Sequence, residues 1–187
     1  MLIFGHIGLT IAIIYTFQRI RFPGLDLDYR LVILGSLLPD IIDKPIGYII
    51  FQKYYENGWI YGHTLLFSLL LLILGYSIAA KYSVLGFSTL LHLIEDGVIV
   101  YMPGTFLWPL LGWNFSKNGE FTSKWIEHII SSLYTDQYLQ ITEFAGLTVI
   151  SYLILRHQLY IKSNLIAFIK AGRLIDPLQI ARNNCSK

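Results

Sequence analysis

The sequence predicts an all-α membrane protein, and three observations support this fold class. Hydrophobic residues make up 55% of the 187 residues, and charged residues only 14%, whereas soluble domains carry roughly 25% charged residues. The mean hydropathy is +0.56. Long apolar stretches recur along the chain, and helices satisfy their own backbone hydrogen bonds in lipid. We therefore predict a polytopic membrane helix bundle with about four spanning helices, a broken or re-entrant helix, and an amphipathic C-terminal helix.

The first spanning helix is predicted over residues 1–17. This stretch lacks a positive n-region and a small-residue cleavage site, so we expect it to be retained rather than removed as a signal peptide. Residues 31–38 and 46–51 are also apolar, but Pro39 and Pro45 interrupt them. Each piece is shorter than the roughly 20 residues of a spanning helix, so a broken or re-entrant helix is predicted. Broken backbone at membrane depth is tolerated only against protein or a wet cavity, which indicates a site.

The rest of the chain contains three further candidate spans and two interfacial segments. Residues 64–80, 84–101 and 138–155 are predicted to cross the membrane. Residues 106–115 are rich in tryptophan and proline, as interfacial segments often are. Residues 165–175 form a basic amphipathic segment that we expect on the membrane surface.

The length suits one domain, with a membrane-embedded part over residues 1–160 and a basic amphipathic cytoplasmic tail over residues 161–187. A net charge of only +2 gives no support for a nucleic-acid partner. The single cysteine, Cys185, excludes an internal disulfide and a cysteine-rich zinc site.

The basic residues favour one orientation in the membrane. If residues 19–30, the turn at Lys81 and everything after Arg156 are cytoplasmic, most of the 14 lysines and arginines lie on that side. The sequence therefore predicts a multi-pass protein of the plasma membrane with a cytoplasmic C-terminus.

This topology brings six acidic and imidazole side chains to a similar depth near the outer face, although they are spread from residue 6 to residue 96. They are His6, Asp40, Asp43, His63, His92 and Asp96. Ionisable groups inside a membrane are costly and usually face a partner or a cavity. We therefore predict that these side chains meet in one pocket.

The chemistry of this set favours a metal. His92 and Asp96 are four residues apart, so they share a helix face and could grip one cation. Glu95 points aside by roughly 100°, as an outer group that orients a ligand or as a general base. Imidazole and carboxylate ligands suit zinc, manganese or iron. The set exceeds what one tetrahedral ion needs, so we predict a divalent metal, zinc or manganese, as one or two ions.

Four blocks of the sequence resemble the signatures of the YdjM-like family of membrane-bound, metal-dependent hydrolases, which has been compared with zinc-dependent phospholipase C. The blocks are LLPDIIDKP (37–45), GHTLLF (62–67), HLIEDG (92–97) and FLWPLLGW (106–113). The resemblance covers residues 1–115 and implies that the metal ligands are His6, Asp40, His63, His92 and Asp96. Many members have one residue between the two aspartates, whereas two separate Asp40 and Asp43 here, so a ligand role for Asp43 stays open.

The leading functional prediction is hydrolysis of a phosphoester, from a small molecule or a membrane lipid headgroup. Metal ions stabilise the attacking and leaving oxygens in such reactions, and Glu95 or Asp43 is predicted as the catalytic base. One alternative is a transporter of metal ions or protons, because transporters also place carboxylates at broken helices. Another is a structural membrane protein without metal. Metal flux and elemental analysis distinguish these alternatives from the hydrolase.

Overall fold

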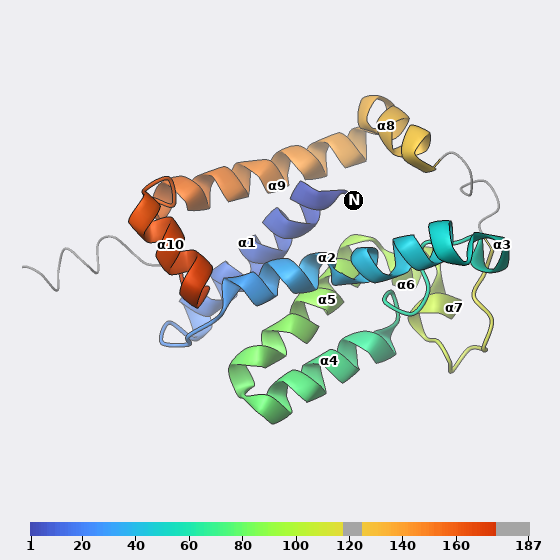
Figure 1. Ribbon diagram of the computed structural model, residues 1–187, viewed down its shortest axis with the longest axis horizontal. Helices are drawn as coiled ribbons and strands as arrows, with labels where there is room; N and C mark the ends of the chain where they lie inside the picture. The colour runs from blue at the N-terminus through green and yellow to red at the C-terminus, as the bar shows by residue number, and fades with distance from the viewer. Residues whose placement is uncertain (118–124, 175–187) are drawn as a thin grey trace, which may run out of the picture.

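The computed structural model describes residues 1–117 and 125–174, and over these ranges the regular elements are helices with no strand. The longer helices of the described part are α1 (Ile3–Arg21), α2 (Tyr29–Pro45), α4 (Leu65–Ile78), α5 (Val84–Glu95) and α9 (Gln137–Arg156). Helix α1 packs on α9 and on α2, α2 packs on α5, and α5 packs on α4 (Figure 1). The predicted all-α class is therefore confirmed.

The short elements gather at the two ends of these helices. They are η1 (Ile46–Ile50), α3 (Gln52–Tyr55), η2 (Ala80–Ser83), α6 (Val98–Tyr101), α7 (Pro103–Phe106), α8 (Trp125–Thr135) and α10 (Lys162–Ala171). In Figure 1, α3, α6 and α7 lie near one end of α2, and α10 lies at the opposite end with the α1–α2 and α4–α5 turns. The start of α1, the end of α2, the start of α4 and the end of α5 are consequently directed toward the same end.

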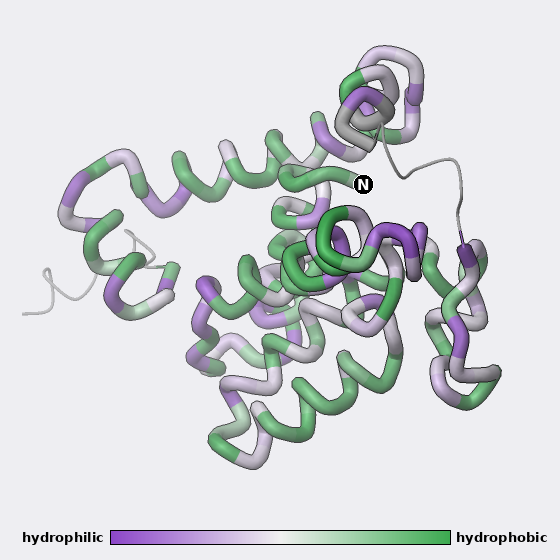
Figure 2. Tube along the Cα trace, turned by 45° about the vertical axis from the view of Figure 1, so that its right-hand side comes forward, coloured by the Kyte–Doolittle hydropathy of each residue, from purple (hydrophilic) through white to green (hydrophobic). Residues whose placement is uncertain are grey.

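Helices α1 and α9 are long and apolar enough to cross a membrane by length and composition. The four-span arrangement predicted from the sequence is not confirmed. Helix α4 is hydrophobic along most of its length (Figure 2) but has only 14 residues, and α5 has 12, against roughly 20 for a span. The predicted helix over residues 84–101 ends early because Gly97 takes a left-handed φ of 65° between α5 and α6.

The predicted break at Pro39 is wrong, because α2 continues through this residue and η1 extends it to Ile50. Proline has no N–H to give to the carbonyl of Gly35, four residues earlier. Helix α5 supplies donors to the carbonyls there: Thr89 Oγ1 donates to Gly35 O at 3.2 Å, and His92 Nδ1 donates to Ser36 O at 2.7 Å. The helix therefore persists, and one of its carbonyls orients a candidate ligand.

The hydrophobic core lies mainly at the α10 end of the molecule. Its buried members are Ile11, Ile14, Leu27, Tyr29, Val32, Val84 and Leu153. Large apolar side chains also remain exposed on the outer faces, for example Ile73, Leu74, Ile141 and Phe144. An apolar exterior of this kind is what a lipid environment accommodates.

Helix α10 is fixed to the start of α2. Arg30 Nη1 donates to the carbonyls of Ile169 and Lys170 at 2.8 and 3.0 Å, and these carbonyls belong to the last turn of α10. The predicted amphipathic segment 165–175 thus corresponds in part to α10. The rest of the predicted tail, residues 175–187 with Cys185, lies outside the described residues.

Helices α1 and α9 cross at glycines. A Cβ on Gly8 would lie 2.3 Å from Gly146 Cα, and one on Gly146 would lie 2.0 Å from Phe4 O. Small residues allow membrane helices to approach this closely. Near the crossing, Glu143 of α9 accepts the backbone N–H groups of Leu2 at 2.8 Å and Phe4 at 3.1 Å. Helix α9 therefore holds the start of α1, which carries His6.

Replacing Gly8 by alanine should destabilise the protein, because the new methyl group would overlap the backbone of α9. Overpacking of this kind costs about 1–3 kcal/mol, and we expect a lower thermal unfolding midpoint in detergent. Gly104→Ala is the matched control, because a Cβ there meets nothing within 4 Å. Equal midpoints for the two variants would contradict the close crossing.

Candidate metal centre

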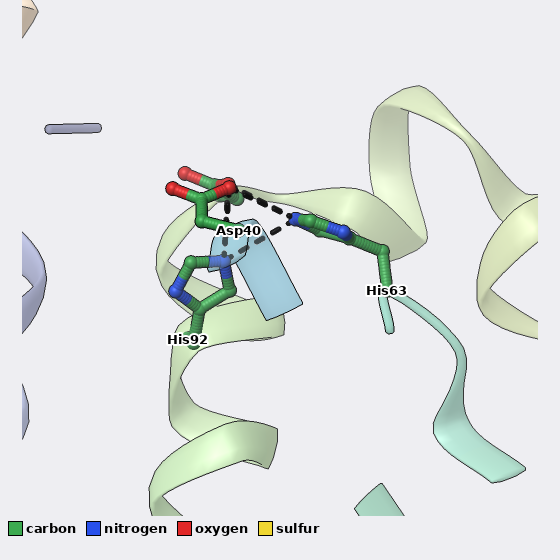
Figure 3. Close-up of side chains that lie close together, drawn as sticks. Asp40, His63 and His92 are labelled. Atoms are coloured by element: carbon green, nitrogen blue, oxygen red, sulfur yellow. Dashed lines mark hydrogen bonds and ion pairs between the residues drawn. The ribbon is translucent and has the colours of Figure 1, made fainter. Parts of the chain in front are cut away.

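Four side chains far apart in the sequence meet at one point and are called the ligand cluster below. They are Asp40, His63, His92 and Asp96, and one ligand atom from each lies within 4.8 Å of all the others. Helix α2 supplies Asp40, the loop before α4 supplies His63, and α5 supplies His92 with Asp96 at its C-cap. Figure 3 shows Asp40, His63 and His92 pointing toward one another.

The spacing of these atoms fits a single bound cation. His63 Nε2 lies 3.3 Å from His92 Nε2 and 3.5 Å from Asp40 Oδ1. Asp96 Oδ2 lies 3.5 Å from His92 Nε2 and 3.8 Å from His63 Nε2. Tetrahedral zinc with bonds of about 2.0–2.1 Å separates its ligand atoms by about 3.3–3.4 Å. The shorter separations match this spacing, and the longer ones, up to 4.8 Å, would contract around a bound ion.

The protons of both histidines are directed away from the cluster. His92 Nδ1 donates to the carbonyl of Ser36, and His63 Nδ1 donates to Asp43 Oδ2 at 2.7 Å. Each Nε2 is therefore the atom left to bind a cation. Two Nε2 atoms at 3.3 Å are favourable neighbours only when a cation or a shared proton lies between them. In the described part of the chain, Asp40 Oδ1 is likewise buried without a hydrogen-bond partner.

Asp43 lies behind His63 and does not face the cluster. Its carboxylate is fully buried and accepts the backbone N–H groups of Ile60 and Gly62 at 2.8 Å and of His63 at 3.0 Å. Together with the imidazole of His63, these groups occupy both carboxylate oxygens. Asp43 thus fixes the backbone of the loop before α4, and the same carboxylate orients the ring of His63.

The same loop is fixed from its other side. Asn57 is buried, and its Nδ2 donates to Trp59 O at 3.0 Å and to Ser116 O at 2.9 Å. Gly47 allows this approach, because a Cβ there would lie 1.8 Å from Asn57 O. The ring of Trp59 stacks on His63 with centroids 5.8 Å apart. The loop therefore presents His63 from a well-packed frame.

His6 lies beside the ligand cluster, on the other oxygen of Asp96. Its Nδ1 is 2.9 Å from Glu95 Oε2, and its Nε2 is 3.1 Å from Asp96 Oδ1. The other oxygen of Glu95 accepts Thr10 Oγ1 at 2.9 Å. His6 Nε2 is buried and faces Asp96 Oδ1. Glu95 therefore holds His6 with Nε2 directed at Asp96.

The structure brings the sequence-predicted residues together in two groups. Asp40, His63, His92 and Asp96 form the cluster, and His6 adjoins it. Asp43 and Glu95, predicted as catalytic, instead contact the Nδ1 atoms of two histidines. Ser36, Thr10 and Lys44 also contact site residues, and these contacts were not predicted from the sequence. For Lys44 a signal existed, because it follows Asp40 by one helical turn.

Over the described residues, fold and site together define an all-helical protein with two helices able to cross a membrane and a buried His/Asp group able to hold a metal ion. The chain matches the family of YdjM inner membrane proteins over residues 1–165 and belongs to that family. The resemblance to the YdjM family and the membrane location are thereby confirmed, whereas the hydrolase activity, the multi-pass topology and the cytoplasmic C-terminus stay predictions. No curated protein and no solved structure shows significant similarity to the chain.

Proposed function

We propose that the protein is a membrane-bound, metal-dependent hydrolase of phosphoesters such as lipid headgroups. The main support is the pair of Nε2 atoms of His63 and His92, which face each other at 3.3 Å while both Nδ1 atoms are held by acceptors. The carboxylates of Asp40 and Asp96 complete the donor set and would balance the charge of a divalent ion. Such an ion acts as a Lewis acid and lowers the pKa of a water molecule.

Imidazole and carboxylate donors suit zinc or manganese, and the ligand cluster would hold the first ion. Asp96 presents Oδ2 to the cluster and Oδ1 to His6. His6 would therefore be either an additional ligand of the same ion or a ligand of a second ion, with Asp96 available to both. A His6→Ala variant distinguishes these cases, because only the second predicts a fall from two metal ions per chain to one.

We assign Asp43 and Glu95 to positioning rather than to the base role predicted from sequence. Asp43 keeps the proton of His63 on Nδ1, and Glu95 does the same for His6. Carboxylates behind metal-binding histidines commonly fix the ring and raise its basicity. Both oxygens of each carboxylate are engaged in these contacts.

The exposure of the cluster supports a substrate that approaches along α2. The side chain of Asp40 is 14% exposed, whereas that of Asp96 is 4% exposed and that of His63 is fully buried. The adjacent residue Ile41 is 55% exposed. An apolar surface beside the accessible ligand suits a lipid whose headgroup enters the site while its chains stay in the bilayer.

The test is metal analysis combined with phosphate release from p-nitrophenyl phosphate and short-chain phosphatidic acid, in detergent. We expect bound zinc or manganese, activity that chelation removes and metal restores, and loss of activity in His92→Ala. His157→Ala is the matched control, because His157 is also buried but contacts Tyr15 at the other end of the bundle. Full activity in His92→Ala would contradict the proposal. Bound metal without turnover, together with metal flux into proteoliposomes, would favour the transport alternative.

A further inference from the structure

Lys44 is the charged neighbour of the most accessible ligand. It follows Asp40 by one turn of α2, and its Nζ lies 2.5 Å from Asp40 Oδ2. The other oxygen, Oδ1, is the one that faces His63 and His92. The side chain of Lys44 is 27% exposed, against 14% for Asp40. Lys44 therefore stands between the ligand cluster and the surroundings, on the side where the cluster is most open.

The charges near the ligand cluster indicate what Lys44 can bind. The carboxylates of Asp40 and Asp96 would neutralise a divalent ion. Among the described residues, the Lys44 ammonium and the Met1 amino group are the cations other than histidine that lie within ion-pair distance of these carboxylates. The Met1 group is only 1% exposed. Lys44 thus carries the positive charge that an anion approaching from outside meets.

The ion pair with Asp40 uses only part of the hydrogen-bonding capacity of Lys44. An exposed ion pair between residues four apart on a helix contributes little to stability. An ammonium has three donors, and Asp40 Oδ2 accepts one of them. The partly exposed side chain leaves donors for a ligand oxygen, and hydrogen bonds between two charged groups are the strong ones.

We propose that Lys44 binds an oxygen of the phosphate group of the substrate at the entrance of the ligand cluster, a role that rests on the proposed hydrolase function. Lys44 selects anionic ligands and holds the phosphate beside Asp40. Because its ammonium can stay close to Asp40 Oδ2, it positions the phosphate without displacing a metal ligand.

The test uses the full chain in detergent, loaded with Co²⁺, whose visible spectrum reports ligands that reach the metal. Inorganic phosphate and short-chain phosphatidic acid are titrated in parallel. For Lys44→Met we expect phosphate binding to weaken by about tenfold or more, the effect of losing one hydrogen bond between charged groups. Lys44→Arg keeps the charge and the hydrogen-bond donors and should therefore bind phosphate more tightly than Lys44→Met. Lys53→Met, at an exposed lysine on α3, is the matched control and should leave the affinity unchanged.

The possible results distinguish a failure of the Lys44 role from a failure of the proposed metal centre. If the unsubstituted protein binds no Co²⁺, the metal centre itself is contradicted. If Co²⁺ binds and Lys44→Met keeps its affinity for phosphate, the role of Lys44 is contradicted. An equal loss in Lys53→Met would also overturn it, because net charge alone would then be responsible. If Lys44→Met fails to fold, Lys44→Gln serves in its place. Tighter binding of phosphatidic acid than of phosphate, with the same dependence on Lys44, identifies a lipid headgroup as the source of the phosphate.

Discussion

Alanine in place of His63 or His92 should remove high-affinity metal binding. Each variant loses a ligand atom that lies within 3.9 Å of at least two other members of the cluster. Loss of an outer group that merely orients a ligand costs roughly 10–100-fold in metal affinity, so loss of the ligand itself should exceed this. The measurement is metal affinity by calorimetry, together with the rise in thermal midpoint on adding metal. A ligand at 100 times its Kd stabilises a protein by about 2.7 kcal/mol, and the variants should lack this gain.

The matched control for these variants is His157→Ala, which also removes a buried imidazole. His157 is 1% exposed and lies 3.2 Å from the hydroxyl of Tyr15, outside the ligand cluster. We expect this variant to have a lower thermal midpoint in the absence of metal. Adding metal should still raise its midpoint as much as that of the unsubstituted protein. A His63→Ala variant with unchanged metal affinity would show that the cluster is a buried hydrogen-bond network and not a metal centre.

The helices most accurately predicted from the sequence are those with long uninterrupted apolar stretches. The predicted spans 1–17 and 138–155 correspond to α1 (Ile3–Arg21) and α9 (Gln137–Arg156). The helix predicted from the apolar residues 84–101 is longer than α5. Hydropathy does not reveal the left-handed backbone at Gly97, which ends the helix early. Local composition identifies an apolar segment but does not fix where the backbone changes direction.

The continuity of α2 could not be predicted from its own sequence. Pro39 removes a backbone donor, and taken alone it favours a break. Side chains of Thr89 and His92, some fifty residues later, donate to the carbonyls near it. Such compensation depends on tertiary packing between α2 and α5, which no local pattern contains.

The sequence predicted that the site residues lie close together, but it did not predict the role of each. Alternating helix directions placed His6, Asp40, His63 and Asp96 at one depth, and the structure brings them together. The role of a carboxylate depends on which nitrogen of a histidine it contacts. The sequence could not decide this for Asp43, which faces the Nδ1 of His63 rather than the ligand cluster.

An Asp43→Asn variant should weaken metal binding and stability together, although it changes almost no volume. The carboxylate accepts three backbone N–H groups and the Nδ1 of His63. An asparagine has one acceptor oxygen, and its NH₂ group would face donors. Removing one member of a buried charged contact costs about 3–5 kcal/mol, so the thermal midpoint should fall clearly. Metal affinity should fall by roughly 10–100-fold, because His63 loses its orienting partner.

A second carboxylate-to-amide change separates this effect from a general loss of charge. Asp136 caps α9 by accepting the N–H groups of Tyr138 at 2.9 Å and Leu139 at 3.2 Å. Asparagine is as good a cap as aspartate, so Asp136→Asn should retain both stability and metal affinity. If Asp43→Asn instead binds metal as tightly as the unsubstituted protein, the orientation of His63 is fixed by packing against Trp59 alone. If it unfolds more easily but binds metal normally at low temperature, Asp43 shapes the loop without tuning the ligand.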